Sequence, residues 1–573
     1  MDCDVAIIGG GPAGSTCGAL LKKYAPHLDV AIFEAAKFPR DHVGESLLPV
    51  VPRILHEMGA FDKVEAADFP IKVGATYRWG QPTDVDLWYF YFIPEGKLAP
   101  EPRPAPFRGQ RTATAFQVDR SLYDKILLDH AAAMGCRVYE NTKVASVETE
   151  GDKVLGLNLE SGRKTDSADL ESRATSHEPR FTARYYVDAS GSRAVIQRAM
   201  NIGVESPTLL RNIAIWDYWQ NAEWAEKVGV GGTFIQVMSL DWGWLWFIPI
   251  TPTRTSLGLV TSAEFYKSSG KSTEELYLHA IEQEPRIRGL VQNASRENIL
   301  QATKDWSYIA DRLCGENWFL AGDSCGFADP ILSAGMSLAQ MGARRVAFSL
   351  IELLKGTPHP DWVRDEYNRI HRKNILNHIR FADYWYSANA RFTDLKEYCA
   401  EIAKDAGITL DADKAFQWLG TGGFADEISG VPFAGSYRIA TIREFTAKFG
   451  GVPHEWSVNR NNIFELETAG AKEDFVAVYE KGEVLRVPCL VRDGKTLPVY
   501  LIYGLVYKAL QKEREIQCLS ERFLFQAQME KMPPSAEISQ FCTEALEALV
   551  TEGWVKASYD SSVPLLNDYP AGR

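Results

Sequence analysis

The chain has 573 residues, of which 46% are hydrophobic and 24% charged, and its formal net charge is −13 at pH 7. This length is sufficient for two or three domains with a substantial buried core. Nucleic-acid phosphates bind basic surfaces, so the acidic balance excludes nucleic acid as an expected partner. No run of about 18 apolar residues occurs, so no membrane-spanning helix is expected.

Nine cysteines are scattered from Cys3 to Cys542 without a C-x-x-C pair. Metal sites and disulfide frameworks both depend on close, repeated spacings, so neither is predicted. Reduced thiols are typical of a cytoplasmic protein, which is where we expect this chain to act.

The first 35 residues predict a βαβ unit. A branched apolar strand over Asp4–Ile8 leads into the turn Gly9-x-Gly11-x-x-Gly14, and a helix over Ser15–Tyr24 and a strand over Val30–Phe33 follow. In such a unit the glycines allow a tight turn, close approach to a pyrophosphate and close helix packing. Glu34 ends the second strand, where a carboxylate can accept hydrogen bonds from a ribose hydroxyl. A dinucleotide site is therefore predicted.

Periodicity predicts further elements along the chain. They are a helix over Ser121–Gly135, a strand over Arg137–Val144, a surface loop or hairpin over 160–179, antiparallel strands within Gly231–Val260, helices over Ala334–Leu354 and Pro360–Lys404, strands over Val476–Val487, Leu490–Gly494 and Leu497–Ile502, and helices near Tyr507–Glu521 and Glu537–Gly553.

A second motif lies about 310 residues after the first. A strand ends in Gly322-Asp323, and Asp329-Pro330 and Ser333-Ala334-Gly335 then open a helix. This order is similar to that of flavoproteins of the p-hydroxybenzoate hydroxylase type. The resemblance implies that Asp323 holds the ribityl chain of FAD and that the helix N-terminus faces the flavin, where its positive end favours negative charge.

The predicted fold is α/β, with a Rossmann-type FAD-binding domain that carries an inserted antiparallel sheet, a helical segment and a small α+β C-terminal domain. The expected boundaries are an FAD-binding core over 1–375 with the inserted sheet at about 205–300, a helical linker or lid over 376–455, and the C-terminal domain over 456–573.

FAD binding leaves two features unexplained. The segment Trp242–Pro249 holds three tryptophans, and strand alternation places Trp244 and Trp246 on one face. Lys72 lies in the apolar stretch Phe69–Ala75. Taken alone, the tryptophans are typical of a bulky core strand and the lysine of a solvated surface.

Taken together, these residues resemble the flavin-dependent halogenases, of the group that includes the chloramphenicol biosynthetic type. The family's W-x-W-x-I-P motif matches Trp244–Pro249, and its essential lysine matches Lys72. The segments Val43–Pro49 and Asp305–Tyr308 also look like this family.

The resemblance implies an oxidoreductase that uses FADH2, O2 and chloride or bromide to form hypohalous acid. Backbone N–H groups of Ala334 and Gly335 would hold the halide, and Trp244 and Trp246 would keep substrate from the flavin. The oxidant would pass through a tunnel to Lys72, which hydrogen-bonds it or forms a haloamine before an electron-rich carbon is halogenated.

The same resemblance implies the partners. The substrate is a free small molecule or an intermediate tethered to a carrier protein. A separate flavin reductase is expected, because the chain has no second G-x-G-x-x-G motif. The alternative activity is a flavin monooxygenase or reductase of the same fold.

Other positions carry open interpretations. Tryptophan halogenases have a glutamate where this chain has Leu332, which disfavours free tryptophan as substrate. Glu45 is either a catalytic carboxylate or a cap of the following helix. Asp305 is a hydrogen-bond acceptor or a covalent link to the flavin, and Tyr386 and Phe381 are substrate-pocket residues or part of a helix face packed on the core.

The resemblance assigns the cofactor contacts to Gly9, Gly11, Ala13, Gly14, Glu34, Arg40, Ser46, Arg120, Val144, Asp305, Asp323, Pro330, Gly335 and Met336.

Overall fold

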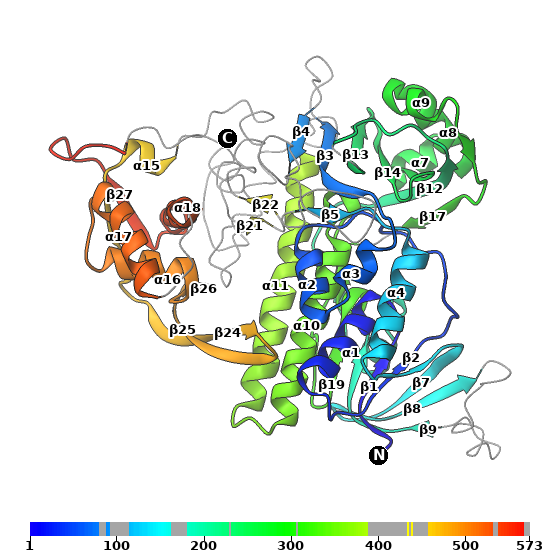
Figure 1. Ribbon diagram of the computed structural model, residues 1–573, viewed down its shortest axis with the longest axis horizontal. Coiled ribbons are helices and arrows are strands. Elements are labelled where there is room, and N and C mark those ends of the chain that lie inside the picture. Colours follow the sequence, from blue (N-terminus) through cyan, green and yellow to red (C-terminus); the bar gives the residue numbers. More distant parts are fainter. Residues whose placement is uncertain are drawn as a thin grey trace. The chain divides into compact units, whose positions relative to one another are not determined.

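The computed structural model describes most of the chain, and its elements are labelled in Figure 1. The described residues are 1–79, 88–91, 114–161, 180–228, 231–304, 307–387, 433–434, 437–438, 456–530 and 537–566. They divide into two units, Met1–Ala382 with Tyr479–Val484, and Asp383–Val478 with Leu485–Arg573. The expected boundary at residue 375 falls inside helix α11 (Pro360–Ser387). Among the described residues, no helix combines the length and the apolar character that crossing a bilayer requires.

The first unit contains the predicted Rossmann-type layer. Five parallel strands have the order β19-β10-β1-β2-β6, and α1 (Pro12–Tyr24) connects β1 to β2. Helices α1 and α10 (Gly335–Leu354) pack against each other. The strands are β1 (Cys3–Ile8), β2 (Val30–Phe33), β6 (Arg137–Tyr139), β10 (Ala183–Asp188) and β19 (Trp318–Leu320). The expected βαβ unit is confirmed.

A nine-stranded sheet forms the second layer of this unit. Its centre is built from β12 (Asn212–Gln220), β15 (Arg254–Ser262), β14 (Gly243–Pro249), β13 (Gly232–Ser239) and β3 (Ile71–Arg78), in that order. The shorter members are β4 (Trp88–Tyr91), β5 (Ala115–Phe116), β16 (Ser295–Arg296) and β17 (Gln301–Lys304). Strand β3 therefore brings Lys72 into a sheet otherwise built largely from residues more than 130 positions later.

The two faces of this sheet have different roles. Alternate residues such as Leu245, Phe247 and Leu257 pack against α8 (Thr273–Gln283) and α9 (Pro285–Val291) in one hydrophobic core. Side chains alternate along a strand, so Trp244 and Trp246 lie on the opposite face. One face of the sheet thus packs on helices, and the opposite face, which carries the tryptophans, borders the candidate site.

The strand expected over Arg137–Val144 is wrong as a single element. Asn141 has a left-handed φ of 51°, which ends β6 and starts β7 (Thr142–Glu150), a strand of a separate sheet with β8 (Lys153–Ser161) and β9 (Arg180–Phe181). Other helices of this unit are α2 (Val50–Met58), α3 (Phe61–Glu65), α4 (Arg120–Ala133), α6 (Val195–Ala199) and α7 (Ala263–Ser268), and a small sheet contains β11 (Val204–Glu205), β18 (Tyr308–Ala310) and β20 (Gly326–Phe327).

The C-terminal residues form α+β structure with boundaries that differ from those expected. The segment Val476–Val487 is a hairpin of β24 (Lys472–Glu480) and β25 (Glu483–Arg492), because Lys481 and Gly482 both have positive φ and turn the chain. The strand expected over Leu497–Ile502 ends with β26 (Lys495–Pro498), and α16 begins at Leu501. The remaining elements are α15 (Ser457–Arg460), β23 (Ile463–Leu466), α16 (Leu501–Leu510), α17 (Ile516–Met529), α18 (Glu537–Thr551) and β27 (Val555–Ser558).

Candidate active site

The glycine turn after β1 has the close contacts that its sequence predicts. A Cβ on Gly9, which has φ of 105°, would lie 2.2 Å from the Ala189 carbonyl oxygen. A Cβ on Gly14 would lie 1.9 Å from the Gly9 carbonyl oxygen. No side chain caps α1, and Pro12 occupies its first turn. Its free N–H groups and positive end are therefore available to a phosphate.

Glu34 and Arg40 lie at this turn. The Glu34 carboxylate accepts hydrogen bonds of 2.8 Å from the N–H groups of Gly10 and Ala36. A carboxylate has about four acceptor positions, so it retains capacity for ligand hydroxyls. The Arg40 guanidinium lies 3.7 Å from the position of a Cβ on Gly11 and covers the Phe38 ring. A cation therefore stands where a pyrophosphate would approach the second glycine.

The second motif adjoins the first in space. A Cβ on Gly322 would lie 3.0 Å from Ala13 Cβ, and Gln340 of α10 donates to Thr16 of α1 over 3.0 Å. Burial raises the pKa of Asp323 to about 6, with the Arg120 charge opposing the shift. Within the described part of the chain, the Asp323 carboxylate has no hydrogen-bond donor. Such a desolvated acceptor fits a ligand hydroxyl.

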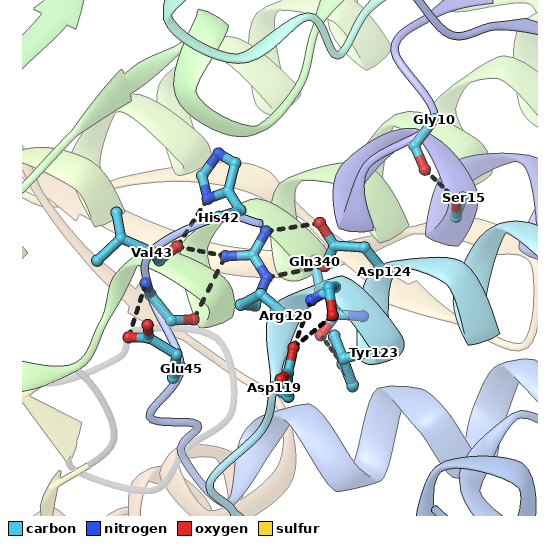
Figure 2. Close-up of polar contacts among 12 residues, drawn as sticks. Gly10, Ser15, His42, Val43, Glu45, Asp119, Arg120, Tyr123, Asp124 and Gln340 are labelled. Carbon is cyan, nitrogen blue, oxygen red and sulfur yellow. Dashed lines mark hydrogen bonds and ion pairs between the residues drawn. The ribbon is translucent and has the colours of Figure 1, made fainter. Parts of the chain in front are cut away.

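Arg120 links the loop before α2 to helix α4, as Figure 2 shows. Its guanidinium forms a bidentate pair with Asp124 at 2.7 and 2.9 Å and donates to the Val43 carbonyl oxygen at 2.7 Å. The nearby Arg120 charge lowers the pKa of His42 to about 4. Because Asp124 holds the guanidinium fork, Arg120 orders the Val43–Glu45 segment and leaves His42 uncharged at neutral pH.

Lys72 is a buried amine, only 1% exposed, on β3. Its Nζ donates to Ser46 Oγ at 2.6 Å, and Ser333 Oγ lies 3.1 Å from the same hydroxyl. Burial lowers the pKa of Lys72 to about 7. The interpretation of Lys72 as a solvated surface residue is wrong, because its side chain is buried and its amine is hydrogen-bonded to Ser46.

Ser333 connects this amine to the start of α10. It has a left-handed φ of 57° and directly precedes Ala334, the N-cap residue of the helix. The N-cap residue provides no side-chain cap, so within the described part of the chain the first N–H groups of α10 have no side-chain acceptor. Phe327 packs over Gly335, where a Cβ would lie 2.6 Å from the ring. The uncapped end suits an anion.

Buried tryptophans line the face of the nine-stranded sheet opposite α8 and α9. The Trp244 and Trp246 ring centroids are 6.0 Å apart, with Trp79 at 6.4 Å from Trp244 and Trp216 at 6.5 Å from Trp246. We call these four residues the tryptophan wall. Gly258 makes room for it, since a Cβ there would lie 2.1 Å from the Trp246 ring.

Glu45 faces this wall and does not cap α2. Its carboxylate accepts from the Tyr218 hydroxyl at 3.0 Å and from the Gly44 N–H at 3.1 Å, whereas no side chain caps α2. Burial raises the pKa of Glu45, although the Tyr218 hydrogen bond opposes the shift. The neighbouring Ser46 is bridged to Gln117 as in an extended strand, so Glu45 and Ser46 point in opposite directions. Glu45 thus pairs with Tyr218, and Lys72 with Ser46.

The remaining predicted residues are placed as follows. Val144 is buried in β7, Pro330 and Leu332 lie in a short 3-10 helix, Met336 is buried in the first turn of α10, and Tyr386 is buried near the end of α11. The backbone of Phe381 lies in α11, and Asp305 lies outside the described residues.

Several site residues were absent from the sequence predictions. Tyr218 and Trp216 could have been found from the alternation of aromatic residues in Asn212–Gln220. Gln117 carries no pattern that would single it out. Its side chain is fully buried and both amide atoms lack a partner among the described residues, so it suits a ligand next to Ser46.

This arrangement combines a dinucleotide turn, an uncapped helix end, a tryptophan wall and a buried amine. The sequence matches the pattern of the tryptophan halogenase family over residues 4–99 and 90–401. The chain belongs to this family. Like the relatives below, it is an oxidoreductase of the flavin-dependent halogenase type.

Two curated relatives illustrate the range of the family. The 1H-pyrrole-2-carbonyl-[peptidyl-carrier protein] chlorinase of Pseudomonas fluorescens is 31% identical over 408 residues, which are 68% of this chain and 85% of the relative. The tryptophan 2-halogenase of Chondromyces crocatus is 30% identical over 390 residues, which are 68% of each chain.

Solved structures show the same fold. The flavin-dependent halogenase CmlS matches all of this chain and 98% of its own, with a TM-score of 0.71 and 23% identity. The myxobacterial chondrochloren halogenase CndH matches 78% of this chain and 96% of its own, with a TM-score of 0.60 and 27% identity. The expected fold class is therefore confirmed.

Proposed function

We propose that the protein uses FADH2, O2 and chloride or bromide to generate hypohalous acid, and that Lys72 directs the halogen to an electron-rich carbon. The observation that carries this proposal is the position of the Lys72 amine. It is buried, has a pKa of about 7, and is joined through Ser46 to Ser333 at the start of α10.

The residues of the cofactor site fit FAD. The glycine turn and Arg40 suit the pyrophosphate, Glu34 suits the ribose, and Asp323 suits the ribityl hydroxyls. Gln117 adds a buried amide that lacks a protein partner among the described residues. When bound in its reduced form, FAD supplies the two electrons that activate O2. The chain's residues contribute binding, orientation and exclusion of water.

The start of α10 supplies the halide site in this proposal. The N–H groups of Ala334 and Gly335 would bind chloride or bromide, because a helix N-terminus carries partial positive charge and no side chain of the described residues caps it. Ser333 immediately before them connects this site to Ser46 and the Lys72 amine.

The tryptophan wall separates oxidant formation from substrate. Bulky rings such as Trp244 and Trp246 exclude an organic substrate from the cofactor, but they let the smaller hypohalous acid diffuse away from it. At neutral pH both forms of Lys72 are populated. The ammonium can hydrogen-bond hypohalous acid, and the neutral amine can accept the halogen from it.

For the substrate we favour an electron-rich aromatic ring on a carrier protein. The support is the similarity to the Pseudomonas chlorinase, whose name specifies a pyrrole on a peptidyl-carrier protein and of which this chain covers 85%. A separate flavin reductase would supply FADH2, because the chain has no second dinucleotide motif.

The test compares wild type with Lys72→Ala, and with Lys143→Ala, which removes an exposed lysine that pairs with Glu160. Each protein receives reduced FAD, O2, bromide and a pyrrolyl thioester on a carrier protein. Monochlorodimedone, in parallel, traps freely diffusing hypohalous acid. We expect Lys72→Ala to oxidise FADH2 and release the oxidant with loss of halogenated thioester, and Lys143→Ala to match wild type. Hydroxylated product formed without halide would instead indicate a monooxygenase.

A further inference from the structure

Trp216 is, with Trp79, one of the two members of the tryptophan wall that the family motif does not include. It lies on β12 opposite Gly258 of β15, and the same glycine accommodates the Trp246 ring. Trp216 is 4% exposed and its ring centroid is 6.5 Å from that of Trp246. Its indole therefore extends the wall toward Tyr218, two residues further along the same face.

The indole N–H groups of the wall differ in their partners. Trp246 Nε1 donates to Ser256 Oγ at 3.1 Å, so the protein satisfies it internally. Trp216 Nε1 is buried and has no acceptor in the described part of the chain. On the opposite face of β12, Trp219 Nε1 donates to the Tyr277 hydroxyl at 2.8 Å. Buried donors are rarely left unpaired, so the Trp216 N–H is expected to serve a ligand.

Trp216 lies near residues that contact Glu45, and the nearby cation is already paired. Its neighbour Tyr218 donates to Glu45, and Ser46, the next residue, accepts from Lys72. The nearby cation is Arg254, which lies 4.0 Å above the Tyr218 ring and is already paired with Asp119 and Glu297. The unpaired donor thus lies on the same sheet face as Tyr218, with three strands between β12 and the Lys72 strand β3.

The chemistry of this position selects a neutral ligand. A bare halide among aromatic rings would need several donors or a free cation to replace its hydration, whereas a neutral molecule with one oxygen acceptor needs only one N–H. We propose that Trp216 Nε1 donates a hydrogen bond to the oxygen of hypohalous acid as it moves along the wall. This inference rests on the proposed function, since that activity supplies the oxidant.

A binding experiment tests the donor without cofactor. The indole groups are labelled with 15N, and the Trp216 resonance is assigned by its absence from Trp216→Phe. Hydrogen peroxide serves as a neutral oxygen probe of similar size, and sodium bromide as the ionic probe. We expect the Trp216 resonance to shift with peroxide and to stay in place with bromide. No response to peroxide, or a response to bromide alone, would overturn the proposal.

A partition experiment tests the donor during turnover. Trp216→Phe keeps an aromatic ring and removes the N–H, and Trp219→Phe does the same on the opposite face of the strand. For Trp216→Phe we expect the ratio of halogenated product to oxidant trapped by monochlorodimedone to fall about tenfold, the effect of one hydrogen bond. Trp219→Phe should retain the wild-type ratio. If wild type halogenates the substrate and both variants keep the wild-type ratio of product to trapped oxidant, the role of Trp216 is contradicted and the proposed function stands. If wild type forms no oxidant, the proposed function itself is contradicted.

Discussion

The Lys72 amine donates to the Ser46 hydroxyl at 2.6 Å, although the two residues are 26 positions apart in the sequence. One lies on β3 of the nine-stranded sheet, and the other lies in the segment that Arg120 orders. Ser333, at the start of α10, reaches the same hydroxyl. The amine is therefore positioned by three segments that are far apart in the sequence.

Ser46→Ala tests whether that position matters. The variant removes the acceptor of the Lys72 hydrogen bond but leaves the amine in place, so we expect about tenfold less halogenated product per FADH2 oxidised. Ser268→Ala, on exposed helix α7, is the matched control and should match wild type. Product yield and FADH2 oxidation are measured together. Equal yields from Ser46→Ala and wild type would contradict a positioning role.

Lys72→Met tests the burial of the amine through stability. The pKa of Lys72 is about 7 in the folded protein and about 10.4 when unfolded, so between these values the unfolded chain binds the additional proton. Wild-type stability relative to Lys72→Met should therefore rise with pH from about 7 to 10, by at most about 1.4 kcal/mol per pH unit. Below pH 7 the difference should level off.

Urea unfolding of both proteins at several pH values provides the measurement. Lys143→Met controls for the loss of a lysine, because Lys143 is exposed and paired with Glu160. A constant stability difference between wild type and Lys72→Met across this range would mean that the amine keeps its ordinary pKa.

Local sequence was sufficient to predict the dinucleotide turn. The contacts of Gly14, with Gly9 and Ile7, are made within the βαβ unit, so a short spacing rule describes them, whereas Gly9 approaches Ala189 of a distant segment. Alternation similarly predicted that Trp244 and Trp246 share a face. The prediction of one strand over Arg137–Val144 was wrong at Asn141. The left-handed backbone of this single residue interrupts the strand, and the pattern of apolar residues gives no sign of it.

The partners within the site depend on tertiary packing. Nothing near Glu45 in the sequence indicates Tyr218, which lies 173 positions away, and the hydrogen bond exists because β12 passes beside the Glu45 loop. The same holds for Ser333 and Ser46, which are 287 positions apart. The sequence could therefore name candidate site residues, but not the residues that position them.

Gly258→Ala tests the space behind the tryptophan wall. A Cβ at this position would lie 2.1 Å from the Trp246 ring, so the ring must move. We expect destabilisation of about 1–3 kcal/mol and a lower product yield per FADH2, measured by urea unfolding and by the thioester assay.

Gly289→Ala is the matched control for this substitution. Gly289 lies in α9, and a Cβ there has no neighbour within 4 Å. Alanine is the better helix former, so this variant should gain about 0.4–1 kcal/mol and keep its yield. If Gly258→Ala behaved in the same way, the wall would tolerate displacement of Trp246.

Asp323→Ala tests the proposed ribityl contact by separating cofactor affinity from stability. Loss of a charged hydrogen-bond acceptor should weaken binding of oxidised FAD by about tenfold or more, measured by fluorescence titration. Asp361→Ala, which removes an exposed carboxylate on α11, should retain wild-type affinity. Equal affinity for all three proteins would remove Asp323 from the cofactor site.

The same variant should have the opposite effect on the cofactor-free protein. The pKa of Asp323 is about 6 when folded and about 3.9 when unfolded, so the folded protein binds the additional proton between these values. Wild-type stability relative to Asp323→Ala should therefore fall as pH rises from about 4 to 6 and stay low above it. Saturating FAD should reduce this deficit, because ligand hydroxyls would then satisfy the carboxylate. A deficit that FAD leaves unchanged would indicate that burial of Asp323 serves a purpose other than cofactor binding.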